Sequence, residues 1–219
     1  MGSIVISCET ISDELNQALA ETGSDHPVIW VQSGFHYTPQ ALRARLQEEI
    51  LKISNVEQIL LAFGFCGNSL LGLSSPKAKL VIPRAEDCIS LLLGDSMGQK
   101  PLSRELETYY LTRGWLAKER NLWQEYERCV LKYGQERAMG IIKEMLGNYR
   151  RLALINTGAY RLADCLEKSR ELARLLDLEH RVVTARPRLL NKLLTGPWDH
   201  EFLIVQPGEE ISIEYLLAH

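Results

Sequence analysis

Short apolar runs alternate with amphipathic stretches along most of the chain, and this alternation constrains the fold more than any other feature. The stretches 10–22 and 39–53 carry apolar residues at helical spacing, and Pro39 suits the first position of a helix. Because parallel strands need crossover helices, the pattern predicts an α/β fold: a mostly parallel sheet flanked by helices. The runs that predict strands are Ile4–Ser7, Val28–Gln32, Ile59–Phe65, Leu80–Ile82, Arg151–Asn156, Arg181–Thr184 and Phe202–Gln206.

The middle of the chain departs from this rhythm. Between Ser103 and Asn148 we find no convincing strand, and apolar residues recur at three- and four-residue steps, which predicts helices broken near Gly134. We therefore expect a helical insertion in the middle of the chain. The 219 residues form either a single α/β unit or two lobes: a cysteine-bearing lobe of residues 1–100, a helical bridge of residues 101–149 and a second lobe of residues 150–219.

Composition narrows the class of protein. A net charge of -3 gives no basic excess, so we expect no nucleic-acid partner. No apolar run reaches the roughly 18 residues that a membrane helix needs, and the N-terminus lacks a signal-peptide pattern, so we expect a cytoplasmic protein without a membrane partner. Five cysteines in a reducing compartment favour metal ligation or catalysis over disulfides.

Three of the cysteines follow apolar runs. Cys8, Cys66 and Cys88 each stand near the end of a predicted strand and before a helix-like stretch. Because the carboxyl ends of parallel strands share one edge of a sheet, where such sheets bind ligands, we expect the three thiols to meet. Three protein ligands with one position open are typical of a reactive metal or cluster site.

The segment around Cys66 is the sharpest local motif. Gly64 and Gly67 permit a tight turn and the close approach of a bound cofactor. Asn68 or Ser69 could cap a following helix, and the positive end of that helix would favour a thiolate at Cys66. The alternative is a tight turn that holds a buried cysteine.

Other polar residues near the predicted edge complete the candidate site. Arg84 could balance a thiolate or bind an anion, or it could form a surface ion pair, while Asp87 is placed to cap the next helix. We assign catalysis to His36 and Arg84, with His36 contacting the substrate in preference to the metal. The alternatives for His36 are a fourth ligand, a proton donor or a solvated loop residue. Glu9 and Asn68 are candidates to support the ligands by hydrogen bonds.

The other two cysteines fit a packing role, and several common functional motifs are missing from the sequence. Cys129 and Cys165 lie within helical patterns, and we assign both to packing. The sequence has no phosphate-binding loop, dinucleotide fingerprint, HExxH motif or nucleophile-elbow serine. It also lacks the CxxC pairs of structural zinc modules, which favours a site assembled from distant residues.

Several of these motifs together are similar to those of a known family, domain of unknown function 1638, of methanogenic archaea and anaerobic or methylotrophic bacteria. The resemblance implies a soluble protein linked to corrinoid and one-carbon methyl metabolism, with a corrinoid protein or methyltransferase as partner, and it assigns no reaction. The turn 34–39 also fits the family, although Tyr37 departs from its pattern. The segments that carry the resemblance are 8–9, 63–68, 81–84, 87–89, 109–112, 114–115 and 156–160.

The sequence thus predicts a metalloprotein whose Cys8, Cys66 and Cys88 bind one centre with an open position for a small-molecule substrate. A [4Fe-4S] cluster is slightly favoured, by analogy with desulfidases that hold such a cluster with three cysteines, and zinc is the alternative. The reaction would be that of a lyase or transferase in sulfur or one-carbon metabolism. Two other hypotheses remain: a cofactor-free binding or chaperone protein serving a corrinoid methyltransferase, and an enzyme with Cys66 as nucleophile.

Overall fold

The computed structural model describes residues 2–94, 107–118, 122–147 and 149–217, apart from the side chains of residues 36, 37, 216 and 217. The chain divides into two compact units, one formed by Met1–Ser103 with Arg186–His219 and the other by Arg104–Ala185. Each contains a sheet with parallel strands and helices, which confirms the predicted α/β class. The division differs from the contiguous lobes expected from the sequence, since the last segment joins the first unit.

The first unit is built on a five-stranded sheet in the order β2-β1-β3-β4-β8. Its first four strands run parallel, whereas β8 runs antiparallel to β4, with Phe202 opposite Pro83. Every strand overlaps an apolar run predicted from the sequence. The strands are β1 (Ser3–Cys8), β2 (Val28–Val31), β3 (Gln58–Ala62), β4 (Lys79–Pro83) and β8 (Phe202–Val205).

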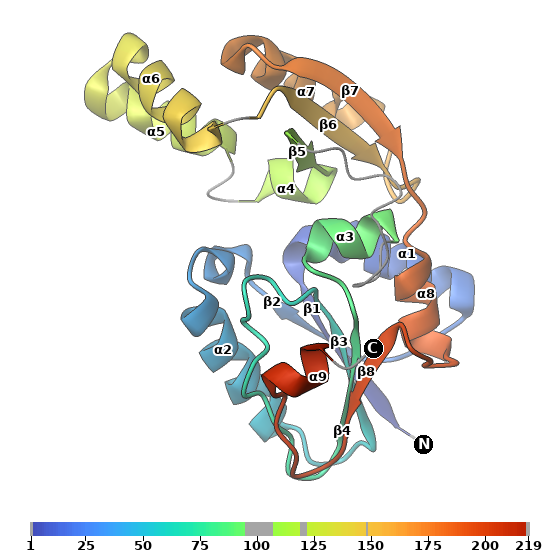
Figure 1. Ribbon diagram of the computed structural model, residues 1–219. Helices are drawn as coiled ribbons and strands as arrows, with labels where there is room; N and C mark the ends of the chain where they lie inside the picture. Colours follow the sequence, from blue (N-terminus) through green and yellow to red (C-terminus); the bar gives the residue numbers. More distant parts are fainter. Residues whose placement is uncertain (1, 95–106, 119–121, 148, 218–219) are drawn as a thin grey trace. The chain divides into compact units, whose positions relative to one another are not determined.

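Helices cover both faces of this sheet. Helix α2 lies on one face, and α1 and α8 lie together on the other (Figure 1). Pro39 occupies the start of α2, as predicted, because its fixed φ suits a first helical turn. The helices are η1 (Glu9–Ile11), α1 (Ser12–Thr22), η2 (Ser33–Tyr37), α2 (Pro39–Lys52), α3 (Cys88–Leu93), α8 (Arg188–Thr195) and α9 (Ile213–Leu217).

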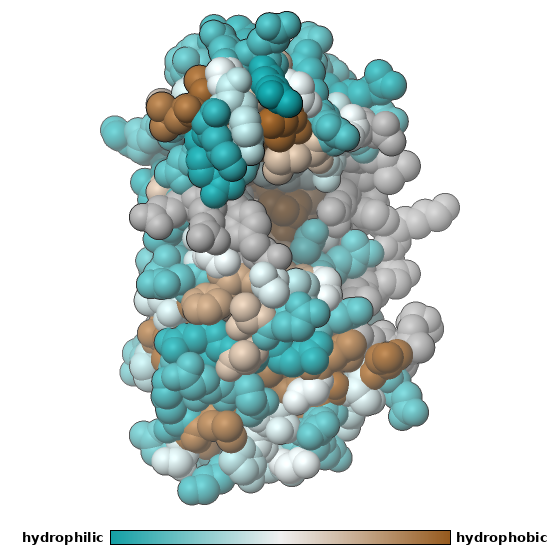
Figure 2. Space-filling view, turned by 90° about the vertical axis from the view of Figure 1, so that its left-hand side faces the viewer, coloured by the Kyte–Doolittle hydropathy of each residue, from teal (hydrophilic) through white to brown (hydrophobic). Residues whose placement is uncertain are grey.

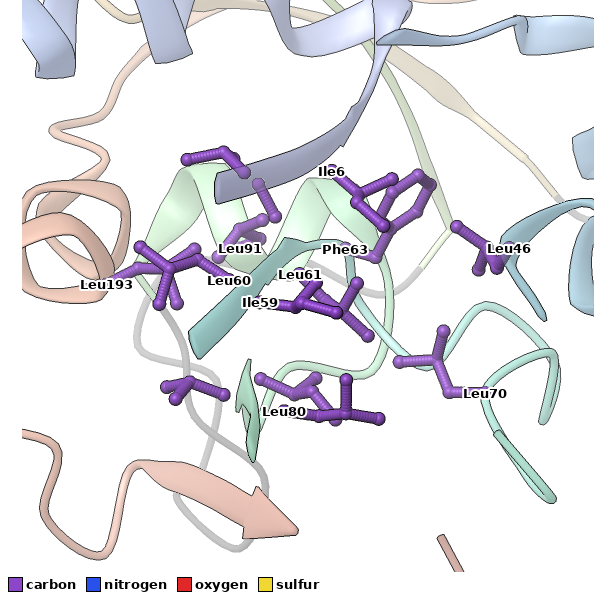
Figure 3. Packing of buried hydrophobic residues seen from close by; sticks show 14 of the residues in the cluster. Ile6, Leu46, Ile59, Leu60, Leu61, Phe63, Leu70, Leu80, Leu91 and Leu193 are labelled. Atoms are coloured by element: carbon purple, nitrogen blue, oxygen red, sulfur yellow. The ribbon is translucent and has the colours of Figure 1, made fainter. Parts of the chain in front are cut away.

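Large aliphatic side chains fill the space on both sides of β3 (Figure 3). Leu91 of α3 and Leu193 of α8 lie on one side, and Leu46 of α2 lies on the other; all three are fully buried. Burial of each such side chain contributes roughly 1.5–3 kcal/mol. A densely packed hydrophobic core therefore supports the ends of these strands.

The second unit contains a parallel three-stranded sheet in the order β5-β6-β7, with α7 packed against β6 and β7. Helices α5 and α6 form a helical hairpin in which Gly134 joins the two helices. Together with α4 they make up the predicted helical insertion (Figure 1). The elements are β5 (Thr108–Leu111), α4 (Arg113–Ala117), α5 (Leu122–Tyr133), α6 (Gln135–Leu146), β6 (Arg151–Asn156), α7 (Ala163–Leu176) and β7 (Glu179–Thr184).

Strand β5 corrects one prediction. No strand was expected between Ser103 and Asn148, yet Thr108–Leu111 pairs in parallel with β6 along its whole length. A four-residue strand with two tyrosines is too short to display a period, so only its pairing with β6 defines it. Residues 95–106 lie outside the described part of the chain.

The surface is mixed. On the face in Figure 2, hydrophobic groups are scattered among hydrophilic ones, as on most protein surfaces. The most exposed large apolar side chain described is Leu131 of α5, at 89%. Of the helices within the described ranges, none has the length and apolar character needed to cross a membrane.

Candidate functional site

The carboxyl edge of the first sheet carries the three cysteines singled out from the sequence. Cys8 is the last residue of β1, Cys66 lies in the turn after β3, and Cys88 begins α3 shortly after β4. These three strands are neighbours and run parallel, so the cysteines share one edge, as predicted. The strand order 2-1-3-4 also places a topological switch point between β1 and β3, where open α/β sheets bind ligands.

Backbone hydrogen bonds join the turn after β3 to the loop between β4 and α3. The Phe65 N–H donates to the Ala85 carbonyl and the Cys66 N–H to the Glu86 carbonyl, each at 2.9 Å. These bonds join the two loops beyond the ends of β3 and β4. The backbone positions of Cys66 and of the segment before Cys88 are therefore fixed relative to one another.

Gly64 allows this close approach. A Cβ atom at this position would lie 2.3 Å from the Asp87 carbonyl carbon, which is too close for any residue with a side chain. The Asp87 side chain in turn caps α3, because its Oδ1 accepts a hydrogen bond from the Ser90 N–H at 2.8 Å. The predicted cap is thus confirmed, and Gly64 serves the contact between two backbone segments.

The described segment between Cys66 and β4 forms turns and not the predicted helix, so that part of the sequence prediction is wrong. Cys66, Gly67 and Asn68 have φ angles of 43°, 67° and 67°, so the chain takes a left-handed path here and continues in turns. The turn closes instead through the Ser69 N–H, which donates to the Phe65 carbonyl at 3.0 Å. Cys66 therefore does not stand at the start of a helix of its own, and Gly67 provides a left-handed backbone position.

Two of the three thiols lie in contact. The Cys66 and Cys88 Sγ atoms are 3.9 Å apart, with Cys66 partly exposed and Cys88 only 2% exposed. The fully buried Cys8 Sγ contacts Thr10, accepting from its N–H at 3.4 Å and lying 3.0 Å from its Oγ1. Within the described ranges, no group of three or more His, Cys, Asp or Glu side chains is placed to hold a metal ion.

Two arginines lie on the segments that form this edge. The Arg84 Nη1 donates to the Tyr215 carbonyl at 2.9 Å, and burial lowers the pKa of its guanidinium from the ordinary value. Arg84 therefore ties the C-terminal helix α9 to the loop before Cys88. Arg43 of α2 donates through Nη2 to the Asn68 carbonyl at 3.0 Å and brings a cation to the Cys66 turn.

Arg43 was not a candidate from the sequence. Its place in the helix 39–53 is that of an ordinary half-exposed position, and no local motif marks it. Only the packing of α2 against the turn, which also brings Pro39 to within 3.4 Å of a Cβ built at Gly67, makes its position visible.

The structure does not test the roles predicted for Glu9 and His36. Glu9 lies in η1, directly after Cys8, and is partly exposed. The backbone of His36 belongs to η2, and its side chain lies outside the described part of the chain. The roles suggested for both residues stay predictions.

The other two cysteines belong to the interior of the second unit, which confirms their assignment to packing. Cys129 of α5 and Cys165 of α7 are 6% and 3% exposed and lie in its hydrophobic core. The Cys165 thiol donates to the Leu162 carbonyl one turn earlier in the chain, at 3.5 Å.

Comparison with known proteins gives one match. No curated protein and no solved structure matches the chain. A family model matches residues 30–194, a range that includes Cys66 and Cys88 and begins after Cys8. This range covers more than half of the sequence, in agreement with the resemblance seen in the motifs. The chain therefore belongs to the family described as protein of unknown function (DUF1638).

Proposed function

We propose that the protein is a metalloprotein whose Cys66 and Cys88 thiolates, with Cys8, bind one metal centre that keeps a coordination position open for a small molecule. The observation that carries the proposal is the 3.9 Å separation of the Cys66 and Cys88 sulfurs. Two thiolates bound at about 2.3 Å to one tetrahedral ion lie about 3.8 Å apart. The backbone bonds between their turns keep the two cysteines next to each other without an ion.

The same distance supports a single ion over a cluster. In a [4Fe-4S] cluster each cysteine binds a different iron, so the cysteine sulfurs are held farther apart than around one ion. We therefore place zinc ahead of the [4Fe-4S] cluster that the sequence slightly favoured. Three thiolates leave one position of a tetrahedral zinc for an exogenous ligand.

Cys8 is the third ligand in this proposal. It ends the strand next to β3, on the same edge as the other two thiols, and its sulfur is buried against Thr10. The Thr10 N–H that donates to this sulfur would stabilise a thiolate there, as hydrogen bonds to metal-bound sulfur do. Cys8 is expected to add affinity to a site that the other pair defines.

The chain's own residues shape what such a site accepts. Zinc would supply a place to hold and activate a thiolate for methyl acceptance. Arg43, bound to the Asn68 carbonyl, brings positive charge to the turn that carries Cys66 and would favour an anionic substrate. In keeping with the family resemblance, the proposed setting is one-carbon transfer with a corrinoid protein or methyltransferase as partner.

Metal analysis of single cysteine variants tests this proposal. Anaerobically purified protein is loaded with Zn²⁺, or with Fe²⁺ and sulfide, and its metal and sulfide contents and absorption spectrum are measured. We expect about one zinc per chain in the wild type, loss of zinc in Cys66→Ala and Cys88→Ala, and weaker binding in Cys8→Ala. Cys129→Ala and Cys165→Ala are the matched controls and should keep the metal.

Two results would contradict parts of the proposal. Equal metal loss in all five variants would mean that the edge cysteines are no more ligands than the packed ones. Four irons and four sulfides per chain, with a cluster spectrum, would restore the [4Fe-4S] alternative.

A cysteine-nucleophile enzyme is the second candidate, because Cys66 is partly exposed whereas Cys88 is buried. Alkylation of Cys66 would then abolish turnover while removal of metal would not. A cofactor-free binding or chaperone role would leave binding of a corrinoid methyltransferase intact in the metal-free protein.

A further inference from the structure

The Cys66–Cys88 pair has the arrangement of a dithiol that can close on itself. The two sulfurs are 3.9 Å apart, and a disulfide bond requires about 2.05 Å. Side-chain rotation can supply much of the difference of about 1.9 Å, because the two turns already lie in backbone contact. The effective concentration of one thiol at the other is therefore high.

The two thiols differ in exposure, and this difference assigns their roles. Cys66 is partly exposed and can meet a reagent from solvent, whereas Cys88 is 2% exposed and meets chiefly its neighbours. Thiol–disulfide exchange proceeds by attack of an accessible thiolate, followed by attack of a second thiol on the mixed disulfide. Cys66 fits the first role and Cys88 the second.

We propose that Cys66 and Cys88 form a reversible intramolecular disulfide by exchange with a small-molecule disulfide. The Cys66 thiolate attacks one sulfur of the reagent and releases one thiolate, which leaves a mixed disulfide on Cys66. Cys88, after losing its proton to solvent, attacks the Cys66 sulfur and releases the second thiolate. The two cysteines are together oxidised by two electrons, and one reagent disulfide is reduced to two thiols.

Closure of the pair would switch the metal site off. A disulfide has no thiolate to offer, so the oxidised protein would lose two of its three proposed ligands. This consequence rests on the proposed function, whereas formation of the disulfide does not. Cys8 takes no part, since its sulfur is buried against Thr10.

The test uses the full-length protein, freed of metal by a chelator and incubated with oxidised glutathione. Free thiols are then alkylated, and the peptides are identified by mass spectrometry. We expect loss of two free thiols and a peptide pair linked through Cys66 and Cys88. Cys129→Ser and Cys165→Ser should behave as the wild type.

Trapping the intermediate sharpens the test. In Cys88→Ser, glutathione should remain on Cys66, and this adduct should disappear at least about tenfold more slowly than in the wild type. Persistence of the adduct in the wild type, or a linkage of Cys66 to any cysteine other than Cys88, would overturn the inference.

Cys8→Ala separates this inference from the proposed function. The variant should form the disulfide at the wild-type rate while binding zinc more weakly. Zinc binding without disulfide formation would refute the redox inference alone. Disulfide formation without zinc binding in the reduced wild type would refute the metal site alone.

Discussion

The two sheets of the molecule have parallel cores, but the turns at their carboxyl edges are held in different ways. In the first unit, backbone bonds run from the Cys66 turn to the loop before Cys88. In the second unit, the turn after β6 is braced by its own side chains: Asn156 Oδ1 accepts from the Gly158 N–H at 3.3 Å and Thr157 Oγ1 from the Ala159 N–H at 3.4 Å.

This difference between the two turns indicates where reactive side chains can come together. A turn braced by its own polar side chains uses them for local structure, as Asx and related turns do. Two turns joined through their backbones hold side chains from distant parts of the chain next to each other. This is how residues 66 and 88, which belong to different loops, come to have sulfurs in contact.

The largest expected effect comes from replacing a glycine at each edge. In Gly64→Ala the new Cβ would lie 2.3 Å from the Asp87 backbone, so the joined turns must separate, at a cost of about 3 kcal/mol or more. Gly158 has a φ of 79° but open space around it, and Gly158→Ala should cost about 1 kcal/mol for the left-handed conformation. Denaturant unfolding measures the loss of stability in both variants. Equal losses would mean that the two turns are not held in different ways.

A smaller effect is expected from the helix caps at the two edges. Asp87 Oδ1 accepts from the N–H and Oγ of Ser90 at 2.8 and 2.9 Å, and Asp87→Ala should cost about 1–2 kcal/mol. The Thr112 hydroxyl caps α4 at 3.4 Å, so Thr112→Val, which keeps the shape, should cost about 0.5 kcal/mol. The free energy of unfolding of the two variants measures this difference. A larger loss of stability in Thr112→Val than in Asp87→Ala would contradict the prediction.

The smallest effect is a dependence on pH confined to the second unit. Burial is the main cause that lowers the pKa of His180 below 6.5, with Arg170 adding to it and Glu167 opposing it, and the ring nitrogen lies 2.9 Å from Ser169 Oγ. The folded state thus prefers neutral imidazole. This contribution to stability is complete above pH 6.5 and is lost as the pH falls below 6.5 toward the folded pKa.

Hydrogen exchange resolved by segment measures this effect. Protection of β7 and α7 should decrease on acidification through pH 6.5, while His180→Gln should lack that component. The same acid sensitivity in His180→Gln would assign the titration to another group.

Much of the fold could be predicted because buried strands leave continuous apolar runs, and Pro39 marks a helix start. Two features left no such trace. Strand β5 is too short to show a period, and the direction of β8 depends on its partner β4, which no local pattern encodes.

The site could be predicted in part for similar reasons. The position of Cys66 and Cys88 at strand ends follows from the order of elements. The left-handed path through Cys66 and Asn68 could not be predicted, because non-glycine residues rarely adopt it. The contact of Arg43 with the turn depends on packing between elements distant in sequence.

The antiparallel pairing of β8 with β4 also bears on how the chain is made. The first unit is encoded in two pieces with the whole second unit between them. On the ribosome, the edge of β4 has emerged long before Phe202–Val205 is synthesised, a delay on the order of ten seconds at typical elongation rates. An open strand edge is a template for wrong pairing, so the nascent chain is most exposed to aggregation during this interval. A chaperone that shields β4 would act there, before the sheet is complete.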